Sequence, residues 1–363
     1  MGVREDVLTV LRGGKPERVP WTIYSVQLFR GHAERELRNQ GLGMLRSWPV
    51  CTSSTPHVEV ETRTIWENGK QLLRRTYHTP VGSVSEKIAY SPSYYNEGSI
   101  SEWIVEYMIK SVSDYKAAQF IVEDTVYEPD YEGFARAQRR FGEDGLLLAR
   151  MGRCPIQRLS IEMAGVERVA LDLHDHPKVV EGFLEALDEK QNEVYEIGVL
   201  SPAELIWSPD NISTSRTSPR WFEKYILPFY NRHAPAVHAA GKLYLSHMDG
   251  PLRQIMHLIA QCDLDVIEAV TPLPMGDISI PQAQAAWPGK AIWCNFPESL
   301  FLADDSAIYD KALELLNTAY GKGRFLLGMT EDYPEERMRG GLSAIARAVA
   351  AYEGQQAKGH SGG

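Results

Sequence analysis

Short apolar runs alternate with amphipathic stretches along most of the chain, and residues 243–272 show this pattern best. An apolar run at 243–245 stops at the loop His-Met-Asp-Gly, residues 247–250. Pro251 suits a first helical position, and the apolar residues at 252, 255, 256 and 259 then fall on one helical face. A second apolar run ends at Glu268. The stretch therefore predicts a strand, a loop, a helix and a second strand.

The same alternation predicts a succession of strand–helix units along the rest of the chain. Units of this length favour a (β/α)8 TIM barrel over an open sheet. We expect one barrel over residues 1–354 and a disordered tail over 355–363. The expected strands lie at 18–25, 145–151, 204–207, 243–245, 266–267, 291–294 and 324–329, and the expected helices at 2–12, 111–122, 131–140, 156–171, 177–198, 219–240, 280–286, 304–319 and 335–353.

One segment, residues 58–92, breaks this rhythm. Its apolar and polar residues alternate as in half-buried strands. Asn68-Gly69 is a strong signal for a two-residue hairpin turn because both positions tolerate a positive φ, and Pro80-Val81-Gly82 marks another turn. We expect an antiparallel β-hairpin or meander inserted early in the fold and covering one mouth of the barrel.

Composition narrows the possible function classes. The net charge of −10 argues against a general nucleic-acid binder, because such proteins present a basic surface. No apolar run approaches about 18 residues, and the amphipathic start is unlike a signal peptide, so we expect no membrane partner. The four cysteines form no CxxC pair, which favours a reducing, cytoplasmic setting. The sequence leaves open whether the protein forms a homodimer.

Side chains capable of chemistry follow several of the expected strands. In a parallel α/β fold the carboxyl ends of the strands lie on one side, so these side chains are expected to converge. His247 and Glu268 stand at successive strand ends, 21 positions apart, and suit a zinc ion, which binds imidazole, carboxylate and thiolate. A lone His after a strand is, however, more often structural than a ligand. The strand-end candidates are Tyr24, Met151, Asp210, His247, Glu268, Cys294 and Glu331.

The loop at 247–250, Glu268 and the following run Thr-Pro-Leu-Pro-Met-Gly-Asp at 271–277 resemble the uroporphyrinogen decarboxylase superfamily. Within it, they are most similar to the zinc-dependent corrinoid methyltransferases, which commonly carry His-x-Cys-Gly at this place. Asp249 stands where that Cys would be. The resemblance implies zinc held by His247 and Glu268 with a further ligand, for which Asp249, Cys294 and Glu331 stay open.

One further site residue follows from the same resemblance, and others follow from residue type. Asp210 resembles the family's strand-end Asp, and we take Asp210 and Glu268 as the catalytic candidates. Asp210 would bind substrate or orient His247, although Asp210-Asn211 also suits a plain turn. The remaining candidates are expected to line the substrate pocket, although an aromatic residue is more often part of the core. They are Tyr24, Met151, Trp207, Asn211 and Phe296.

The resemblance implies a methyltransferase that moves a methyl group from a small methylated donor, here a phenyl methyl ether, to the Co(I) of a partner corrinoid protein. Carboxylate ligands make zinc a harder Lewis acid than thiolates do, which suits an ether oxygen. The chain lacks the Asp-x-His-x-x-Gly pattern of corrinoid-binding domains. Two alternatives remain, a catalytically silent binding barrel and a tetrapyrrole decarboxylase. The decarboxylase lacks support because the family's paired arginines are absent around Tyr24–Arg30.

Overall fold

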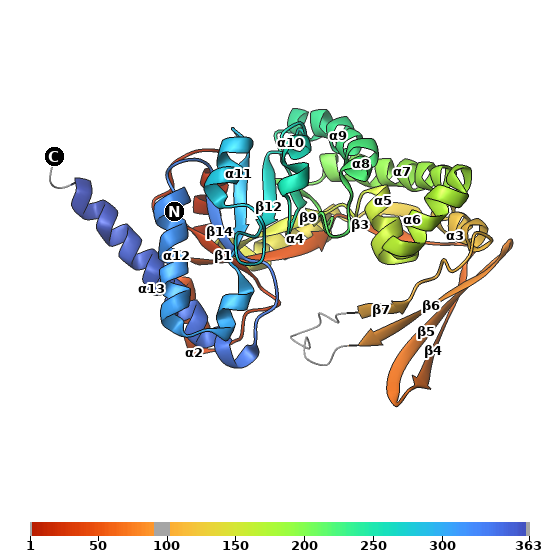
Figure 1. Ribbon diagram of the computed structural model, residues 1–363, viewed down its shortest axis with the longest axis horizontal. Helices are drawn as coiled ribbons and strands as arrows, with labels where there is room; N and C mark the ends of the chain where they lie inside the picture. Colours follow the sequence, from red (N-terminus) through yellow and green to blue (C-terminus); the bar gives the residue numbers. More distant parts are fainter. Residues whose placement is uncertain (1, 91–101, 361–363) are drawn as a thin grey trace. The chain divides into compact units, whose positions relative to one another are not determined.

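The computed structural model describes residues 2–90 and 102–360 and contains a closed barrel of eight parallel strands (Figure 1). Around the barrel the strands follow the order β1-β14-β13-β12-β11-β10-β9-β2. This confirms the predicted (β/α)8 fold. The strands are β1 (Trp21–Tyr24), β2 (Leu42–Pro49), β9 (Gly145–Arg150), β10 (Leu205–Ser208), β11 (Leu243–His247), β12 (Val266–Val270), β13 (Ala291–Asn295) and β14 (Phe325–Met329).

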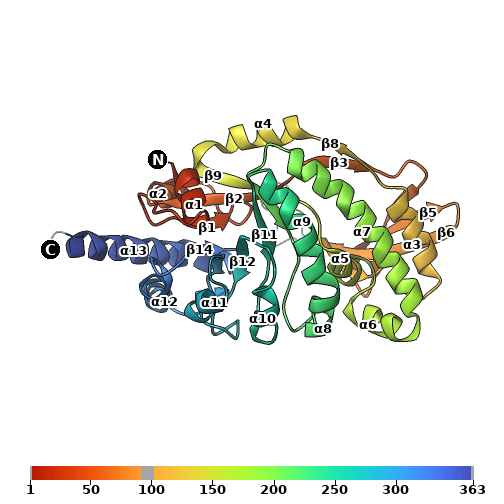
Figure 2. The ribbon, with the colours of Figure 1, turned by 90° about the horizontal axis from the view of Figure 1, so that it is seen from above.

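Helices of the barrel unit alternate with these strands, and α11 and α12 lie next to each other in both views (Figures 1 and 2). Among the described helices, none combines the length and apolar character needed to cross a membrane. The helices are α1 (Val3–Leu11), α2 (His32–Asn39), α4 (Tyr131–Phe141), α8 (Pro219–Trp221), α9 (Leu227–Ala239), α10 (Met256–Ile259), α11 (Ile280–Ala286), α12 (Asp305–Ala319) and α13 (Glu335–His360).

The C-terminal segment differs from the expected disordered tail. The helix α13 continues to His360, so residues 355–360 are helical, while 361–363 lie outside the described residues. The run Gln-Gln-Ala-Lys after Gly354 explains the difference, since all four residues have high helix propensity. The strand β2 was not expected either, because its glycine and arginine interrupt the apolar pattern.

The chain divides into two compact units, and the barrel forms the first. The second consists of Pro49–Tyr131 and Met151–Ser201. Its four-stranded antiparallel sheet confirms the antiparallel insertion expected at 58–92, of which residues 91 and 92 are not described, and adds the strand β7 beyond it. The strands are β4 (Glu59–Glu67), β5 (Lys70–Thr79), β6 (Gly82–Tyr90) and β7 (Glu102–Glu106), in the order β4-β5-β6-β7.

The predicted turn between β4 and β5 has the conformation that its sequence indicates. Asn68 and Gly69 adopt φ values of 50° and 73°, as a two-residue hairpin turn with both φ positive requires. The predicted helix at 156–171 is divided instead. Gly165 has a φ of 81°, which no helix interior accepts, and α6 begins directly after it.

The other described elements of the second unit are a small antiparallel pair of strands and several helices. The helix α3 packs against β6. The elements are β3 (Cys51–Ser54), paired with β8 (Val126–Pro129), and the helices α3 (Asp114–Glu123), α5 (Pro155–Arg158), α6 (Val166–Asp175) and α7 (Pro177–Leu200).

The barrel interior is an apolar core to which α1 contributes. Val266 and Ala291, members of this core, are the first residues of their strands, so α1 packs at the end of the barrel where the strands begin. The opposite end, where the strands finish, is left for polar side chains. The core consists of Val3, Val7, Leu8, Val10, Leu11, Leu45, Leu146, Leu148, Leu205, Trp207, Leu245, Val266, Ala291, Trp293 and Leu326.

Candidate metal centre

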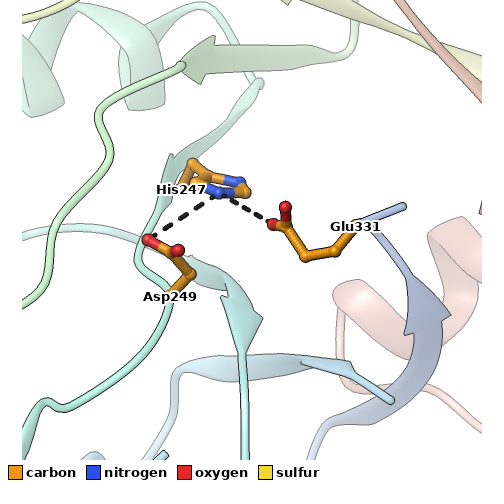
Figure 3. A group of neighbouring side chains, drawn as sticks. All are labelled: His247, Asp249 and Glu331. Carbon is orange, nitrogen blue, oxygen red and sulfur yellow. Dashed lines mark ion pairs between the residues drawn. The ribbon is translucent and has the colours of Figure 1, made fainter. Parts of the chain in front are cut away.

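Three potential metal ligands converge at the carboxyl end of the barrel (Figure 3). His247 is the last residue of β11, Asp249 follows it in the loop, and Glu331 lies two residues beyond β14. The imidazole Nε2 of His247 lies 3.5 Å from Oε1 of Glu331 and 4.0 Å from Oδ1 of Asp249. One ligand atom from each residue fits within 4.8 Å of the others. The group therefore offers one nitrogen and two carboxylates to a single ion.

Asp249 shows that this arrangement suits a cation. Its Oδ1 is buried and has no hydrogen-bond partner among the described residues. A buried carboxylate oxygen without a hydrogen bond is costly, and a cation between Asp249, His247 and Glu331 would offset that cost. Three protein ligands of imidazole and carboxylate type match a catalytic zinc site, in which a further position stays open for substrate.

Glu268 contacts the other nitrogen of the same imidazole. Its Oε2 lies 2.7 Å from Nδ1 of His247, and the carboxylate is completely buried. A carboxylate on Nδ1 favours the tautomer with the proton on Nδ1, so that Nε2, once it has lost its own proton, presents a lone pair to Asp249 and Glu331. Of the two predicted ligands at successive strand ends, the geometry thus places His247 in the group and Glu268 behind it.

The charge around His247 determines its protonation before a metal binds. Burial lowers the pKa of His247, but the charge and hydrogen bond of Glu268, together with Glu331 and Asp249, outweigh burial. The pKa of His247 therefore lies well above its ordinary value. In the metal-free chain the imidazole is protonated at neutral pH, and a metal ion must displace that proton.

Tyr24 and Trp207, both expected in a substrate pocket, direct their polar atoms at Glu268. The hydroxyl of Tyr24 donates to Oε1 over 3.3 Å, and Nε1 of Trp207 donates to Oε2 over 3.2 Å. Burial, with the charge and hydrogen bond of Glu268, raises the pKa of Tyr24 well above its ordinary value, so the hydroxyl remains a donor. The ring of Trp207 meets that of His247 edge-on at 6.4 Å. These contacts fix Glu268 in place.

Asp210 belongs to a buried hydrogen-bond network beside β11. Its Oδ2 accepts from Oγ of Ser208 and from the hydroxyl of Tyr230, both over 2.7 Å. The Tyr230 hydroxyl also lies 2.7 Å from Oγ of Ser246, the residue before His247. Asp210 thus stabilises the ends of β10 and β11, and Asn211 follows it half-buried.

Three other candidates lie outside the converging group. Cys294 is completely buried, burial raises the pKa of its thiol, and its Sγ donates to the backbone oxygen of Asn295 over 3.4 Å. Phe296 is completely buried and packs edge-on against Phe301, with ring centroids 6.0 Å apart. Met151 is buried in the second unit. Of the open ligands, the structure brings Asp249 and Glu331 to His247, but not Cys294.

Two residues near this group were not expected from the sequence. Burial raises the pKa of the Glu298 carboxyl, and the charges of Glu331 and Asp249 add to the effect. Tyr333 is buried, and its hydroxyl has no hydrogen-bond partner in the described part of the chain. Glu298 follows β13 by three residues, so extending the strand-end search into the loops would have found it.

One solved methyltransferase has a similar fold, although its sequence is only distantly similar. A methyltransferase from Methanosarcina mazei superposes with a TM-score of 0.58 at 13% identity, covering 97% of this chain and 99% of that one. A B12-independent methionine synthase from Shewanella sp. W3-18-1 gives a TM-score of 0.46 at 9% identity, covering 90% of this chain and 87% of that one, too low to carry an argument. No curated protein shows a significant sequence match.

The family assignment rests on sequence. The model of the family described as uroporphyrinogen decarboxylase (URO-D) matches residues 130–349, more than half of the chain. The match includes β9 to β14 and most of the side chains of the candidate centre, among them His247, Asp249, Glu268 and Glu331. The chain therefore belongs to the uroporphyrinogen decarboxylase family.

Proposed function

We propose that this protein is a zinc-dependent methyltransferase that moves a methyl group from a phenyl methyl ether to the Co(I) of a separate corrinoid protein. The observation that carries the proposal is the convergence of His247, Asp249 and Glu331, with a buried oxygen of Asp249 that has no hydrogen-bond partner among the described residues. The likeness of the fold to a methyltransferase is consistent with it.

The residues divide into ligands and a positioning carboxylate. His247 through Nε2, Asp249 and Glu331 would hold the ion, and Glu268 orients the imidazole through Nδ1. When bound, zinc would act as a Lewis acid on the ether oxygen, and the two carboxylates keep it harder than thiolates would. We thus assign Glu268 to orientation rather than to direct ligation.

The reaction transfers the methyl carbon to cobalt while both electrons of the carbon–oxygen bond remain on oxygen, so that a phenolate leaves. The negative charge on this oxygen is the charge that the site must stabilise. Glu298, whose pKa is raised beside Asp249 and Glu331, is suited to hold a proton near the leaving group.

The test is metal content together with methyl transfer. Purified protein is expected to contain about one zinc per chain, and 2-methoxyphenol is expected to methylate a reduced corrinoid protein. His247→Ala should lose most of the zinc, because removing one of three ligands cripples such a site. His257→Ala is the matched control, since His257 is exposed on α10. Full zinc retention in His247→Ala would refute the assignment.

The decarboxylase alternative predicts carboxylate loss from a polycarboxylated porphyrinogen. Arg30 is the one arginine near the position of the family's paired arginines, and its Nη1 lies 3.7 Å from Oε1 of Glu34. We therefore expect no carboxylate loss from a polycarboxylated porphyrinogen. Robust decarboxylation by metal-free protein would overturn the methyltransferase proposal, while zinc binding without any turnover would favour a silent binding barrel.

A further inference from the structure

Arg150 is the last residue of β9, on the face of the strand that points into the barrel. Leu146 and Leu148 of this strand belong to the core inside the barrel. Side chains alternate between the two faces of a strand, so Arg150 continues the series of Leu146 and Leu148 toward the barrel axis. Its register partner on β10 is Trp207, whose side chain also belongs to the interior. Arg150 therefore belongs to the top layer of the barrel, the layer that includes Trp207.

The charge of Arg150 is exceptional on the barrel strands. The eight strands carry two arginines and no lysine, and the other arginine is Arg46. Arg46 follows the core residue Leu45, so it points to the outer face, where its guanidinium lies 5.0 Å from the ring centroid of Trp48. Arg150 is thus the one Arg or Lys of these strands that faces inward.

Arg150 also has no partner within the described ranges. Its side chain is exposed and makes neither an ion pair nor a hydrogen bond there. Arg153, three residues later, pairs with Glu162 over 3.1 Å. The charge of Arg150 nevertheless acts on the phenol of Tyr24, which donates to Glu268. An unpaired guanidinium therefore stands near the hydrogen-bonded shell of the candidate centre.

The remaining charges of the site would repel an anion. Glu268, Asp249 and Glu331 surround His247 with carboxyl groups, and Glu298 lies near Asp249 and Glu331. A negatively charged ligand that enters this mouth needs a cation besides the metal, and Arg150 is the inward-facing cation of the described barrel strands. A guanidinium binds a carboxylate through two parallel hydrogen bonds, which fixes orientation as well as charge.

We propose that Arg150 binds a carboxylate of the methyl donor, so that methoxylated aromatic carboxylates are preferred over neutral methoxyarenes as substrates. This rests on the proposed methyl transfer at His247. The strand β10 separates β9 from β11, so the two strands that carry Arg150 and His247 lie about 10 Å apart. A benzene ring with a carboxylate and a methoxy group bridges such a span, and it would lie beside Tyr24 and Trp207.

The test compares two probes of the same shape, 4-methoxybenzoate and the neutral 4-methoxybenzamide. Isothermal titration of the zinc-loaded wild type is expected to give about 10- to 100-fold tighter binding of the acid, the range of a charged hydrogen-bonded pair. Arg150→Gln should remove that preference, and Arg150→Lys should restore part of it. The control Arg46→Gln should keep the full preference, because Arg46 faces outward.

Each result decides the inference. Equal binding of acid and amide by the wild type would overturn it, and so would a preference retained in Arg150→Gln, which would place the carboxylate on the metal. Methyl transfer to the corrinoid protein is measured separately on each donor. Arg150-dependent binding of the acid without transfer from any donor would refute the proposed function alone. If Arg150→Gln still prefers the acid and still transfers methyl groups from 2-methoxyphenol as the wild type does, the role of Arg150 alone is refuted.

Discussion

The imidazole of His247 divides the candidate centre into two sides. Nε2 faces Asp249 and Glu331, and Nδ1 faces Glu268. A metal-binding histidine needs its other nitrogen held by an acceptor, and Glu268 is itself held by two donors. Chemistry at Nε2 therefore depends on Glu268 and its two donors as well as on Asp249 and Glu331.

The first prediction concerns Glu268→Gln. The amide nearly preserves volume, so packing should change little. It loses the charge that supports Nδ1 and one acceptor for Tyr24 or Trp207. We expect zinc affinity to fall by about 10- to 100-fold, measured by competition with a chromophoric chelator, while the melting temperature of the metal-free protein changes little. Unaltered zinc affinity would show that Glu268 does not support the site.

The second prediction concerns pH. The pKa of His247 is raised, so the metal-free imidazole keeps its proton at neutral pH and zinc must displace it. Zinc affinity should rise with pH, by roughly tenfold per unit, until pH exceeds the folded pKa. The proton also stabilises the metal-free fold below the unfolded pKa of His247, and this contribution is lost as pH rises through the folded value.

Zinc titrations and thermal melts between about pH 6 and 9 measure both effects, a range that brackets the ordinary histidine pKa. Glu268→Gln removes the charge of Glu268, the largest of the causes that raise the pKa of His247. The slope of zinc affinity against pH should therefore be shallower in this variant. An affinity independent of pH in the wild type would contradict a protonated His247.

Sequence reasoning found the residues of the candidate centre but not their arrangement. Strand ends identified His247, Glu268 and Glu331 as candidates, because parallel strands finish on one side of a barrel, and the family's His-x-Cys-Gly motif identified Asp249. Which ring nitrogen faces Glu268 depends on the rotamer of His247 and on the β11–β12 register, in which His247 pairs with Glu268. Residue order alone carries no such information.

At the scale of elements, the structure departs from expectation where single residues override a pattern. The helix expected at 156–171 contains apolar residues at suitable spacing, but Gly165 adopts a positive φ and divides it. The turn at Asn68-Gly69 was predicted correctly because its conformation depends on two adjacent residues alone. Local signals are therefore predictable when no distant contact competes with them.

The third prediction contrasts two glycines of the second unit. Gly69 has a φ of 73° with open space around an added Cβ, so Gly69→Ala introduces backbone strain without a clash. We expect a loss of about 1 kcal/mol in the free energy of unfolding. Gly182 lies within α7, also with open space, and Gly182→Ala should gain up to about 1 kcal/mol from helix propensity. Chemical denaturation measures both, and equal shifts would contradict this account.

At the scale of the whole molecule, the candidate centre and the inserted sheet belong to different compact units. The proposed ligands His247, Asp249 and Glu331 all belong to the barrel unit, while the strands β4 to β7 belong to the second unit. Sequence periodicity predicted the closed barrel, because regular strand–helix units leave few other folds. It could not predict a second compact unit, which depends on contacts between residues far apart in the chain, such as those of β3 with β8.

The last prediction uses this division to locate the effect of the metal. A ligand that binds only the folded state stabilises it by about 2.7 kcal/mol at a concentration 100 times its Kd. Removal of zinc with a chelator should therefore speed hydrogen exchange in peptides from β11, β12 and β14. Peptides from β4 and β5 serve as the internal reference and should change less, because they contribute no ligand. His247→Ala should exchange like the chelated wild type and should not respond to chelator. A chelator effect that persists in His247→Ala, or that is largest in β4 and β5, would show that the stabilising metal binds elsewhere.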